Sequence, residues 1–300
     1  MLDLCTLGTG GTMPLPDRAL SALYARVNGR ALLIDCGEGT QVGVQRLGWG
    51  MQCIDAILIT HFHADHCSGL PGMLLALTKA LRTAPLHIYG PVGLTAVVNG
   101  LRVIAPQLSF PVVLHDLTGQ TDFEAIGLHI TAFPVDHAMP CLGYRLHLPR
   151  KAAFDPQKAK RCGVPLPLWK LLQQGETVEA NGQTFRPEDV MGAPRQGITV
   201  LYATDTRPVD AIADLGFRCD LMILEGMYGA EEKFPLAVKN HHMLFREAAA
   251  LARDAEAGRL LLTHFSTSME TPEDFLQNAQ DIFPDTALAA DGMTFTLQYP

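Results

Sequence analysis

The feature that most constrains this 300-residue chain is a cluster of metal-binding side chains directly after a short apolar run. The run at residues 56–59 has the length and composition of a buried strand. Residues 61–66 then bring three histidines and one aspartate in the spacing His-x-His-x-Asp-His. Because ligands bind at the carboxyl ends of strands in α/β sheets, we expect a site at this point.

The spacing within this cluster suits two ions. His61 and His63 share one side of an extended segment, since side chains alternate along it. Asp65 and His66 follow where the chain must turn, so they can serve a neighbouring ion. Neutral imidazole and carboxylate are the ligands of catalytic zinc, which keeps an open position for water. The chain has 11 histidines in 300 residues, so three within six positions are more than a random distribution would place there.

Further candidate ligands also stand at the ends of apolar runs. Asp205 follows the predicted strand 198–203, His264 follows the predicted strand 260–263, and His137 precedes a strand predicted to start at Leu142. This concentration predicts one site built from the ends of many strands. The remaining histidines that lie in or beside strands are interpreted as ordinary core or edge residues: His87, His115, His129 and His147.

Composition narrows the class of protein. A hydrophobic content of 48% with 18% charged residues is ordinary for a soluble globular enzyme. The net charge of −8 disfavours a broad nucleic-acid-binding surface but leaves room for a local basic patch. No apolar run reaches the ~18 residues of a membrane span, and the first residues lack the basic region of a signal peptide. The seven cysteines are odd in number and form no Cys-x-x-Cys pair, which predicts reduced thiols and a cytoplasmic protein.

Strand and helix signals alternate in each half of the chain, which predicts an αββα sandwich with two similar halves. We expect a single domain over residues 1–300 with an insertion at about 149–197. The insertion is rich in proline and basic residues and has few long apolar runs. Within it, residues 157–161 are a candidate for a short basic helix.

The motif at 61–66 resembles the signature of the metallo-β-lactamase superfamily. Two further stretches, DCGEGTQ at 35–41 and GLPG at 69–72, resemble its ribonuclease Z branch, the tRNA 3′-processing endonucleases. The resemblance runs over nearly the whole chain. It implies a hydrolase with the α/β sandwich of that superfamily and two divalent metal ions, zinc being favoured and manganese or iron being alternatives. It also implies that the insertion is an arm that grips tRNA away from the cleavage site.

The resemblance assigns the metal ligands by position. One ion would be bound by His61, His63 and His137. The other would be bound by Asp65, His66 and His264, with Asp205 bridging the two ions. Asp35 matches a residue that orients ligands in this family.

The resemblance also implies catalytic residues. Asp65 can accept the proton of the attacking water. Glu225 and His242 fall where the family has a glutamate and a histidine that together protonate the leaving group. His241 remains a competitor of His242 for this role, because the two histidines are adjacent and Met243 follows where the family usually has serine.

Three functions stay open from the sequence: an endoribonuclease acting on precursor tRNA, a hydrolase of a small lactone, sulfate ester or cyclic phosphodiester, and a binding protein on a degenerate hydrolase fold. The complete ligand set argues against the third. The basic insertion favours the first. The net acidity, and the lack of an arginine in residues 265–269 after His264, favour the second. We expect no membrane partner, and a homodimer is among the open oligomeric states.

Overall fold

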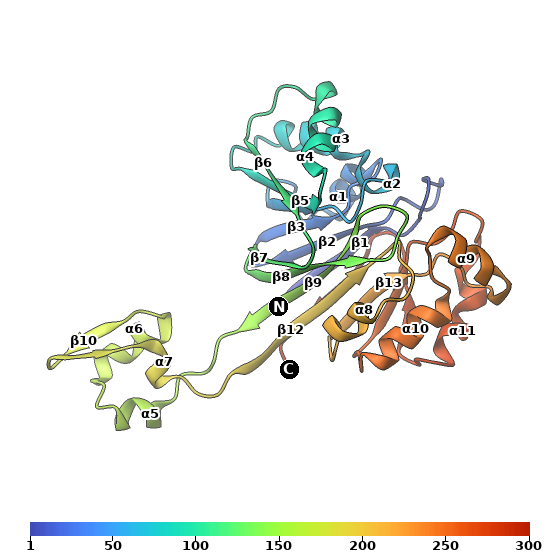
Figure 1. Cartoon of the computed structure of the whole chain (residues 1–300). Helices are drawn as coiled ribbons and strands as arrows, with labels where there is room; N and C mark the ends of the chain where they lie inside the picture. The colour runs from blue at the N-terminus through green and yellow to red at the C-terminus, as the bar shows by residue number, and fades with distance from the viewer. The chain divides into compact units, whose positions relative to one another are not determined.

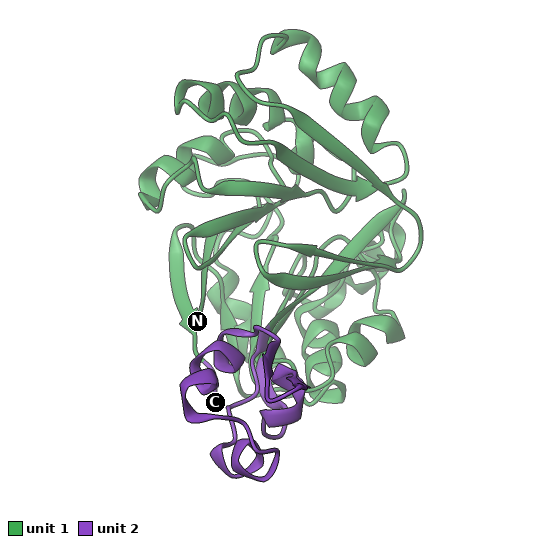
Figure 2. Ribbon diagram, turned by 90° about the vertical axis from the view of Figure 1, so that its left-hand side faces the viewer, with its two compact units in different colours: residues 1–148, 198–298 green, residues 149–197, 299–300 purple.

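The computed structural model describes all 300 residues and divides them into two compact units (Figures 1 and 2). Unit 1 comprises residues 1–148 and 198–298. Unit 2 comprises residues 149–197 together with residues 299–300, and its main segment coincides with the predicted insertion. None of the helices combines the length and the apolar character that crossing a membrane requires.

The first sheet of unit 1 has seven strands in the order β16-β1-β2-β3-β4-β5-β6. Strands β3 to β6 run parallel, whereas β16, β1, β2 and β3 pair antiparallel. In chain order the strands are β1 (Leu2–Gly8), β2 (Ala22–Val27), β3 (Arg30–Ile34), β4 (Ile54–Leu58), β5 (Leu86–Pro91), β6 (Val112–Leu117) and β16 (Met293–Leu297). Because β3 and β4 are parallel, the residues that follow them meet at one edge of the sheet.

The second sheet of unit 1 also has seven strands, in the order β15-β14-β13-β12-β9-β8-β7. Strands β12 to β15 are parallel, and β7, β8 and β9 are antiparallel. In chain order the strands are β7 (Thr121–Ala125), β8 (Leu128–Val135), β9 (Cys141–Arg150), β12 (Arg195–Ala203), β13 (Leu221–Glu225), β14 (Leu260–Thr263) and β15 (Thr286–Leu288). The carboxyl ends of β12 and β14 therefore also lie on the same side of the second sheet.

Helices cover the outer face of each sheet, which gives the four layers of unit 1 in Figure 1. The first sheet packs against α1 (Thr40–Leu47), α3 (Leu70–Lys79) and α4 (Leu94–Leu101). The second sheet packs against α8 (Asp210–Leu215), α10 (Phe245–Asp254) and α11 (Leu276–Gln280). Two further short helices adjoin candidate site residues: α2 (Ala64–Cys67) follows His63, and α9 (Phe234–Asn240) precedes His241. The predicted αββα sandwich is confirmed.

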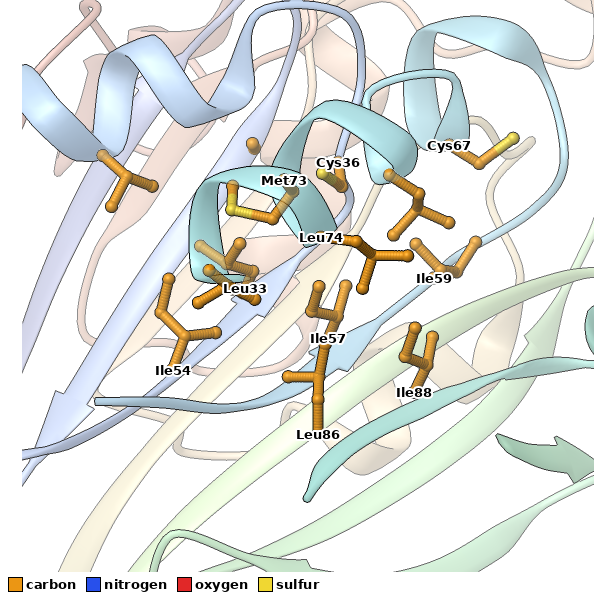
Figure 3. Close-up of a cluster of buried hydrophobic side chains, with 14 of the residues drawn as sticks. Leu33, Cys36, Ile54, Ile57, Ile59, Cys67, Met73, Leu74, Leu86 and Ile88 are labelled. Atoms are coloured by element: carbon orange, nitrogen blue, oxygen red, sulfur yellow. The ribbon is translucent and has the colours of Figure 1, made fainter. Parts of the chain in front are cut away.

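The core under α3 shows why these segments form helix and strands (Figure 3). Met73 and Leu74 of α3 pack on Leu33, Ile57 and Ile88 of three neighbouring strands, and all five side chains are fully buried. Burial of each such side chain contributes about 1.5–3 kcal/mol relative to exposure to water. The apolar runs of the sequence therefore fix the strands whose ends carry the candidate ligands.

Two features differ from the prediction of similar halves. Strands β7 to β9 come from the first half of the chain but belong to the second sheet. Strand β16, from the end of the chain, pairs with β1 in the first sheet, with Leu2 opposite Leu297. This pairing covers the backbone groups that β1 would otherwise leave open at the sheet edge. The sheets thus do not divide at the middle of the sequence.

Several predicted boundaries also shift. The sequence also predicts helices over 243–255 and 272–282. The first begins at Phe245 in the structure, and the second begins as a 3₁₀ turn at Pro272–Phe275 before α11. Residues 287–290 predict a strand, and the structure has β15 at Thr286–Leu288. Helix α9 had no sequence signal that separated it from a loop, because it is only seven residues long and has Pro235 in its first turn.

Unit 2 is built from short elements around a small core of its own. Its elements are α5 (Pro156–Arg161), a 3₁₀ turn (Leu166–Leu168), α6 (Trp169–Gln174), β10 (Val178–Ala180), β11 (Gln183–Phe185) and α7 (Pro187–Val190). The core is formed by Ala159, Val164, Leu172, Val178, Phe185 and Val190. Asp155 accepts hydrogen bonds from the backbone N–H groups of Gln157 and Lys158 and so caps α5, the predicted basic helix.

Replacement of Gly69 by alanine should destabilise unit 1. An added Cβ would lie 1.8 Å from the carbonyl oxygen of Gly37, a backbone atom that cannot rotate away. We expect Gly69→Ala to lower the free energy of unfolding by about 2–3 kcal/mol, as overpacking does, in urea denaturation. Gly100→Ala is the control: Gly100 lies in α4 with nothing within 4 Å of its added Cβ, so alanine should stabilise by about 0.5–1 kcal/mol. Equal stability of the two variants would contradict the close approach.

Candidate metal centre

The ends of several strands of unit 1 bring the candidate ligands into one cluster. His61 and His63 follow β4, His137 follows β8, Asp205 follows β12, and His264 follows β14. Asp205 and His264 adopt left-handed backbone conformations, with φ of 55° and 57°. These conformations are uncommon for residues other than glycine, although aspartate and histidine adopt them more often than most, and they turn the chain sharply at the strand end.

The first group of ligand atoms comes from three histidines and one aspartate: His61, His63, His137 and Asp205. His61 Nε2 lies 2.9 Å from His63 Nδ1, and His63 Nδ1 lies 3.3 Å from His137 Nε2. Asp205 Oδ2 lies 3.8 Å from His61 Nε2. His61 and Asp205 are buried, whereas His63 and His137 are partly exposed and form the open side of the group.

The second group is formed by Asp65, His66 and His264, with the other oxygen of Asp205 facing it. His66 Nε2 lies 3.5 Å from Asp65 Oδ2 and 3.2 Å from His264 Nε2. Asp205 Oδ1 lies 3.3 Å from His66 Nε2 and 3.2 Å from His264 Nε2. The two oxygens of one carboxylate therefore face two separate groups of ligand atoms.

These distances fit transition-metal ions. A tetrahedral ion with bonds of ~2.0–2.1 Å separates its ligand atoms by roughly 3.4 Å, close to the separations in both groups. Asp205 Oδ1 is buried and has no hydrogen-bond partner within the protein, although buried polar atoms are normally paired. The imidazole nitrogens of His66 and His264 that face each other would share a cation readily, because neutral imidazole offers a lone pair there. The protein therefore has the side chains of a metal-binding site.

A buried hydrogen-bond network behind the ligands fixes their orientation. Asp35 follows β3 and is fully buried, with a left-handed φ of 64°. It accepts hydrogen bonds from the backbone N–H and the hydroxyl of Thr60, at 2.8 and 3.0 Å, and pairs with His66 Nδ1 at 2.8 Å. Thr60 Oγ1 also lies 3.0 Å from His61 Nδ1. Asp35 thus sets which nitrogen of His66 faces the centre, the usual task of a carboxylate behind a metal-binding histidine.

The glycine-rich turn after β1 closes the centre from another side. The backbone N–H of Thr12 donates to Asp65 Oδ2 at 2.6 Å. Gly11 lies against the ring of His264, and a Cβ at this position would be 2.6 Å from His264 Cε1. Sequence reasoning missed both Thr12 and Thr60, because a backbone donor leaves no residue-type signal and a threonine after a strand is too common to point to a site.

The charges of the centre depend on one another. Burial lowers the pKa of His61 to about 2, so this ring is neutral and able to donate a lone pair. Burial opposes ionisation of Asp65 and Asp205, but neighbouring histidines outweigh it and hold both pKa values below their usual range. His66 is fully buried, yet the carboxylates of Asp205 and Asp35 raise its pKa well above the usual value. The buried carboxylates therefore favour a positive charge next to His66, and a bound metal cation can supply that charge.

Glu225, which is fully buried, and His242, which is partly buried, form a pair beside the centre. Glu225 Oε2 lies 3.0 Å from His242 Nδ1 and accepts the backbone N–H of Met243 at 3.1 Å. Glu225 Oε1 accepts the backbone N–H of Thr206. Burial lowers the pKa of His242, but the Glu225 carboxylate outweighs this effect and raises it to about 9. His242 also lies within ligand distance of Asp205 and His264.

His241 is placed differently from its neighbour. Its ring is 40% exposed and pairs with Asp136 at 3.0 Å. Its backbone carbonyl oxygen faces His137 Nδ1 at 3.3 Å. Of the two adjacent histidines, only His242 therefore reaches Glu225. The four histidines expected to be ordinary core or edge residues belong to neither ligand group: His87, His115, His129 and His147.

Comparison with known proteins supplies the family. A family model described as "Beta-lactamase superfamily domain" matches residues 174–265, and one described as "Anti-Pycsar protein Apyc1" matches residues 2–148. A ribonuclease Z of Lachnospira eligens is 47% identical over 300 residues, covering 100% of this chain and 99% of that protein. The chain belongs to the ribonuclease Z family. A ribonuclease Z of Clostridium acetobutylicum is 45% identical and covers 97% of this chain and 96% of its own.

A solved structure agrees with this assignment. The crystal structure of the short form of human tRNase Z superposes with a TM-score of 0.71 at 25% identity, over 99% of both chains. The resemblance inferred from the motif is therefore confirmed, and so is the metallo-β-lactamase fold. As a member of the ribonuclease Z family, the protein is a hydrolase.

Removal of the Asp35 carboxylate should weaken zinc binding. Asp35→Ala leaves His66 Nδ1 and the Thr60 N–H buried without their partner, so affinity for zinc should fall by about 10–100-fold. The measurement is a competition titration with a chromophoric chelator. Asp3→Asn removes the charge from the peripheral Asp3–Arg26 pair and should leave zinc affinity unchanged. Wild-type affinity in Asp35→Ala would show that Asp35 does not orient a ligand.

Proposed function

We propose that this protein is a dinuclear metal-dependent endoribonuclease that cleaves precursor tRNA at its 3′ end. The observation that carries the proposal is a carboxylate, Asp205, whose two oxygens face two groups of metal-binding side chains. Ribonuclease Z is the name of relatives that are 45–47% identical over nearly their whole length, and tRNase Z is the name of the similar human structure. The small-molecule hydrolase remains the alternative for the test below.

In this proposal the ligand atoms of the two groups divide between two ions. One ion would be held by His61, His63 and His137 and the other by Asp65, His66 and His264, with one oxygen of Asp205 available to each group. Zinc is favoured because a set of imidazoles and carboxylates suits it, although manganese and iron can use similar ligands. Bound divalent ions supply a water of lowered pKa and neutralise charge on the phosphate.

Protons are handled by Asp65 and by the pair of Glu225 and His242. Asp65 is ionised at neutral pH because neighbouring histidines outweigh its burial and lower its pKa, so its carboxylate is available to accept the proton of the attacking water. His242 is protonated at neutral pH, since its pKa is raised to about 9. It can therefore donate the proton that the ribose alkoxide needs to leave, and Glu225 holds its Nδ1 during the transfer.

Unit 2 supports RNA as the substrate through its charge. Residues 149–197 carry eight basic and five acidic residues, a net charge of +3, whereas the whole chain carries −8. Six of the basic residues are exposed: Lys151, Lys160, Arg161, Lys170, Arg186 and Arg195. Such residues contact phosphates without reading sequence and so position the RNA. We propose that unit 2 is a substrate arm inserted into a single hydrolase domain.

The proposal is tested by comparing turnover of precursor tRNA with turnover of an aryl phosphodiester, bis(p-nitrophenyl) phosphate, under the same conditions. We expect specific cleavage at the 3′ end of the tRNA, with kcat/KM far above that for the aryl ester. Cleavage of tRNA should also fall with added salt, because phosphate contacts release counterions. Turnover of the aryl ester without turnover of tRNA would support a small-molecule hydrolase.

Metal analysis should find two transition-metal ions in each chain after purification and exposure to zinc. Asp205→Ala should lose at least one ion, because both ligand groups share this carboxylate. Inductively coupled plasma mass spectrometry measures the content after dialysis. Asp136→Ala is the control, since Asp136 is exposed and belongs to neither group. A content near zero or one in the wild-type protein would refute the dinuclear centre.

Loss of the general acid should depend on the leaving group. His242→Ala should reduce tRNA cleavage by about 10²–10⁴-fold, as expected for general acid catalysis, and largely spare the aryl phosphodiester, whose leaving group needs no proton. His241→Ala, at the adjacent and exposed position, is the control and should cost less. Equal loss of both activities in His242→Ala would assign His242 to the metal site or to folding.

A further inference from the structure

Arg207 lies at the junction of the segments that carry the catalytic groups. Its guanidinium contacts both oxygens of the Glu247 carboxylate, one of them at 3.0 Å, and donates to the carbonyl oxygen of His242. The side chains of Arg207 and Glu247 are only 15% and 14% exposed. Partly buried, bidentate pairs of this kind hold a more fixed geometry than exposed ion pairs do.

The segment that Arg207 contacts is a connection between two helices, which is also held by the hydrogen bonds from His242 N to Ala237 O at 2.9 Å and from Met243 N to Glu225 Oε2 at 3.1 Å. The connection from α9 to α10 consists of residues 241–244, which belong to neither helix. Within this connection the His242 ring must meet Glu225, and the His241 carbonyl oxygen must meet His137 Nδ1. Displacement of the connection would therefore move the His242 ring away from Glu225.

Glu247 fixes the far side of the same connection. Its carboxylate accepts the backbone N–H of Leu244 at 2.9 Å and so caps the start of α10. The carboxylate is held in place by Arg207, so the cap and the arginine form one unit. The ring of Phe234, at the start of α9, lies 5.6 Å from the Arg207 guanidinium. Arg207 thus contacts the start of α9, the start of α10 and the connection between them.

The backbone of Arg207 is anchored to the metal ligands. Arg207 N donates to the carbonyl oxygen of Asp136 at 2.9 Å, directly before His137. Asp136 N in turn donates to Thr206 Oγ1 at 3.0 Å. Asp205 lies two positions before Arg207, and His137 directly follows Asp136. The backbone of Arg207 is therefore tied to the segments that carry these two candidate ligands, while its side chain contacts the carbonyl oxygen of His242.

We propose that Arg207, held by Glu247, is a positioning residue that sets His242 against Glu225 and in register with the metal ligands. The proposal rests on the proposed function for its catalytic meaning, but the position of His242 can be measured without any activity. Arg207 itself touches neither ligand group, and its contribution is to the geometry of proton donation.

The first experiment compares kinetic parameters of Arg207→Ala and wild type, both loaded with metal. We expect kcat for precursor tRNA to fall by about 10²-fold, the scale of a misplaced catalytic group. KM for tRNA, turnover of bis(p-nitrophenyl) phosphate and metal content should stay near wild type. Arg246→Ala is the matched control, because Arg246 forms an exposed pair with Glu231 at 3.0 Å. It should change neither substrate's kinetics.

A second variant covers the case in which Arg207→Ala leaves Glu247 unpaired and fails to fold. Arg207→Gln combined with Glu247→Gln leaves no buried charge, and the amide oxygen that Glu247→Gln introduces can still accept the Leu244 N–H. The double variant should show the same selective loss. Equal loss on both substrates, or loss of metal, in this double variant would overturn the proposal, since it would assign the pair to folding or to the metal site.

A spectroscopic measurement separates this inference from the proposed function. The Nδ1 proton of His242 in its hydrogen bond to Glu225 should give a downfield NMR resonance, assigned by its absence in His242→Ala. We expect this resonance to be lost or shifted in Arg207→Ala and unchanged in Arg246→Ala. If wild type fails to cleave tRNA, the proposed function fails while the resonance still tests the positioning. An unchanged resonance in both Arg207 variants overturns the inference.

Discussion

The buried Asp205 carboxylate is the interaction on which the centre depends. It lies between three histidines on one side and Asp65, His66 and His264 on the other, and one of its oxygens has no partner within the protein. A carboxylate removed from water is costly unless positive charge compensates it. Cations bound by the two groups of ligand atoms around this carboxylate would supply the compensating positive charge. The proposed chemistry follows from the same requirement.

The sandwich makes this arrangement rigid. Two sheets, each with parallel strands ending at one edge, supply ligands from β4, β8, β12 and β14. Fully buried leucine and isoleucine side chains behind those strands fix their positions. Left-handed residues then turn the chain at the strand ends, a local strain that the packed core supports. The candidate ligands therefore stand at the ends of core strands, whereas the proposed acid His242 lies on a connection between helices.

That contrast gives the Arg207–Glu247 pair its significance. A candidate ligand at a strand end is positioned by the sheet, whereas the proposed acid His242 lies between two helices, where this pair adds contacts to those of the neighbouring backbone. The pair reaches from the strand-end segment that carries Asp205 to the connection that carries His242. In the proposed mechanism, the pair would thus keep His242 aligned with the two groups of candidate ligands.

The sequence by itself determined the family, the sandwich and the identity of the ligand candidates. Apolar runs ending in histidine or aspartate are local patterns, and the His-x-His-x-Asp-His spacing is specific. The sequence left His241 and His242 as alternatives, because adjacent residues have the same local surroundings. Only the tertiary structure decided that His242 faces Glu225, that β16 returns to β1, and that Thr12, Thr60 and Arg207 support the centre. Each of these contacts joins residues that are separated in the chain, so it forms and stabilises the protein only when the sheets have packed.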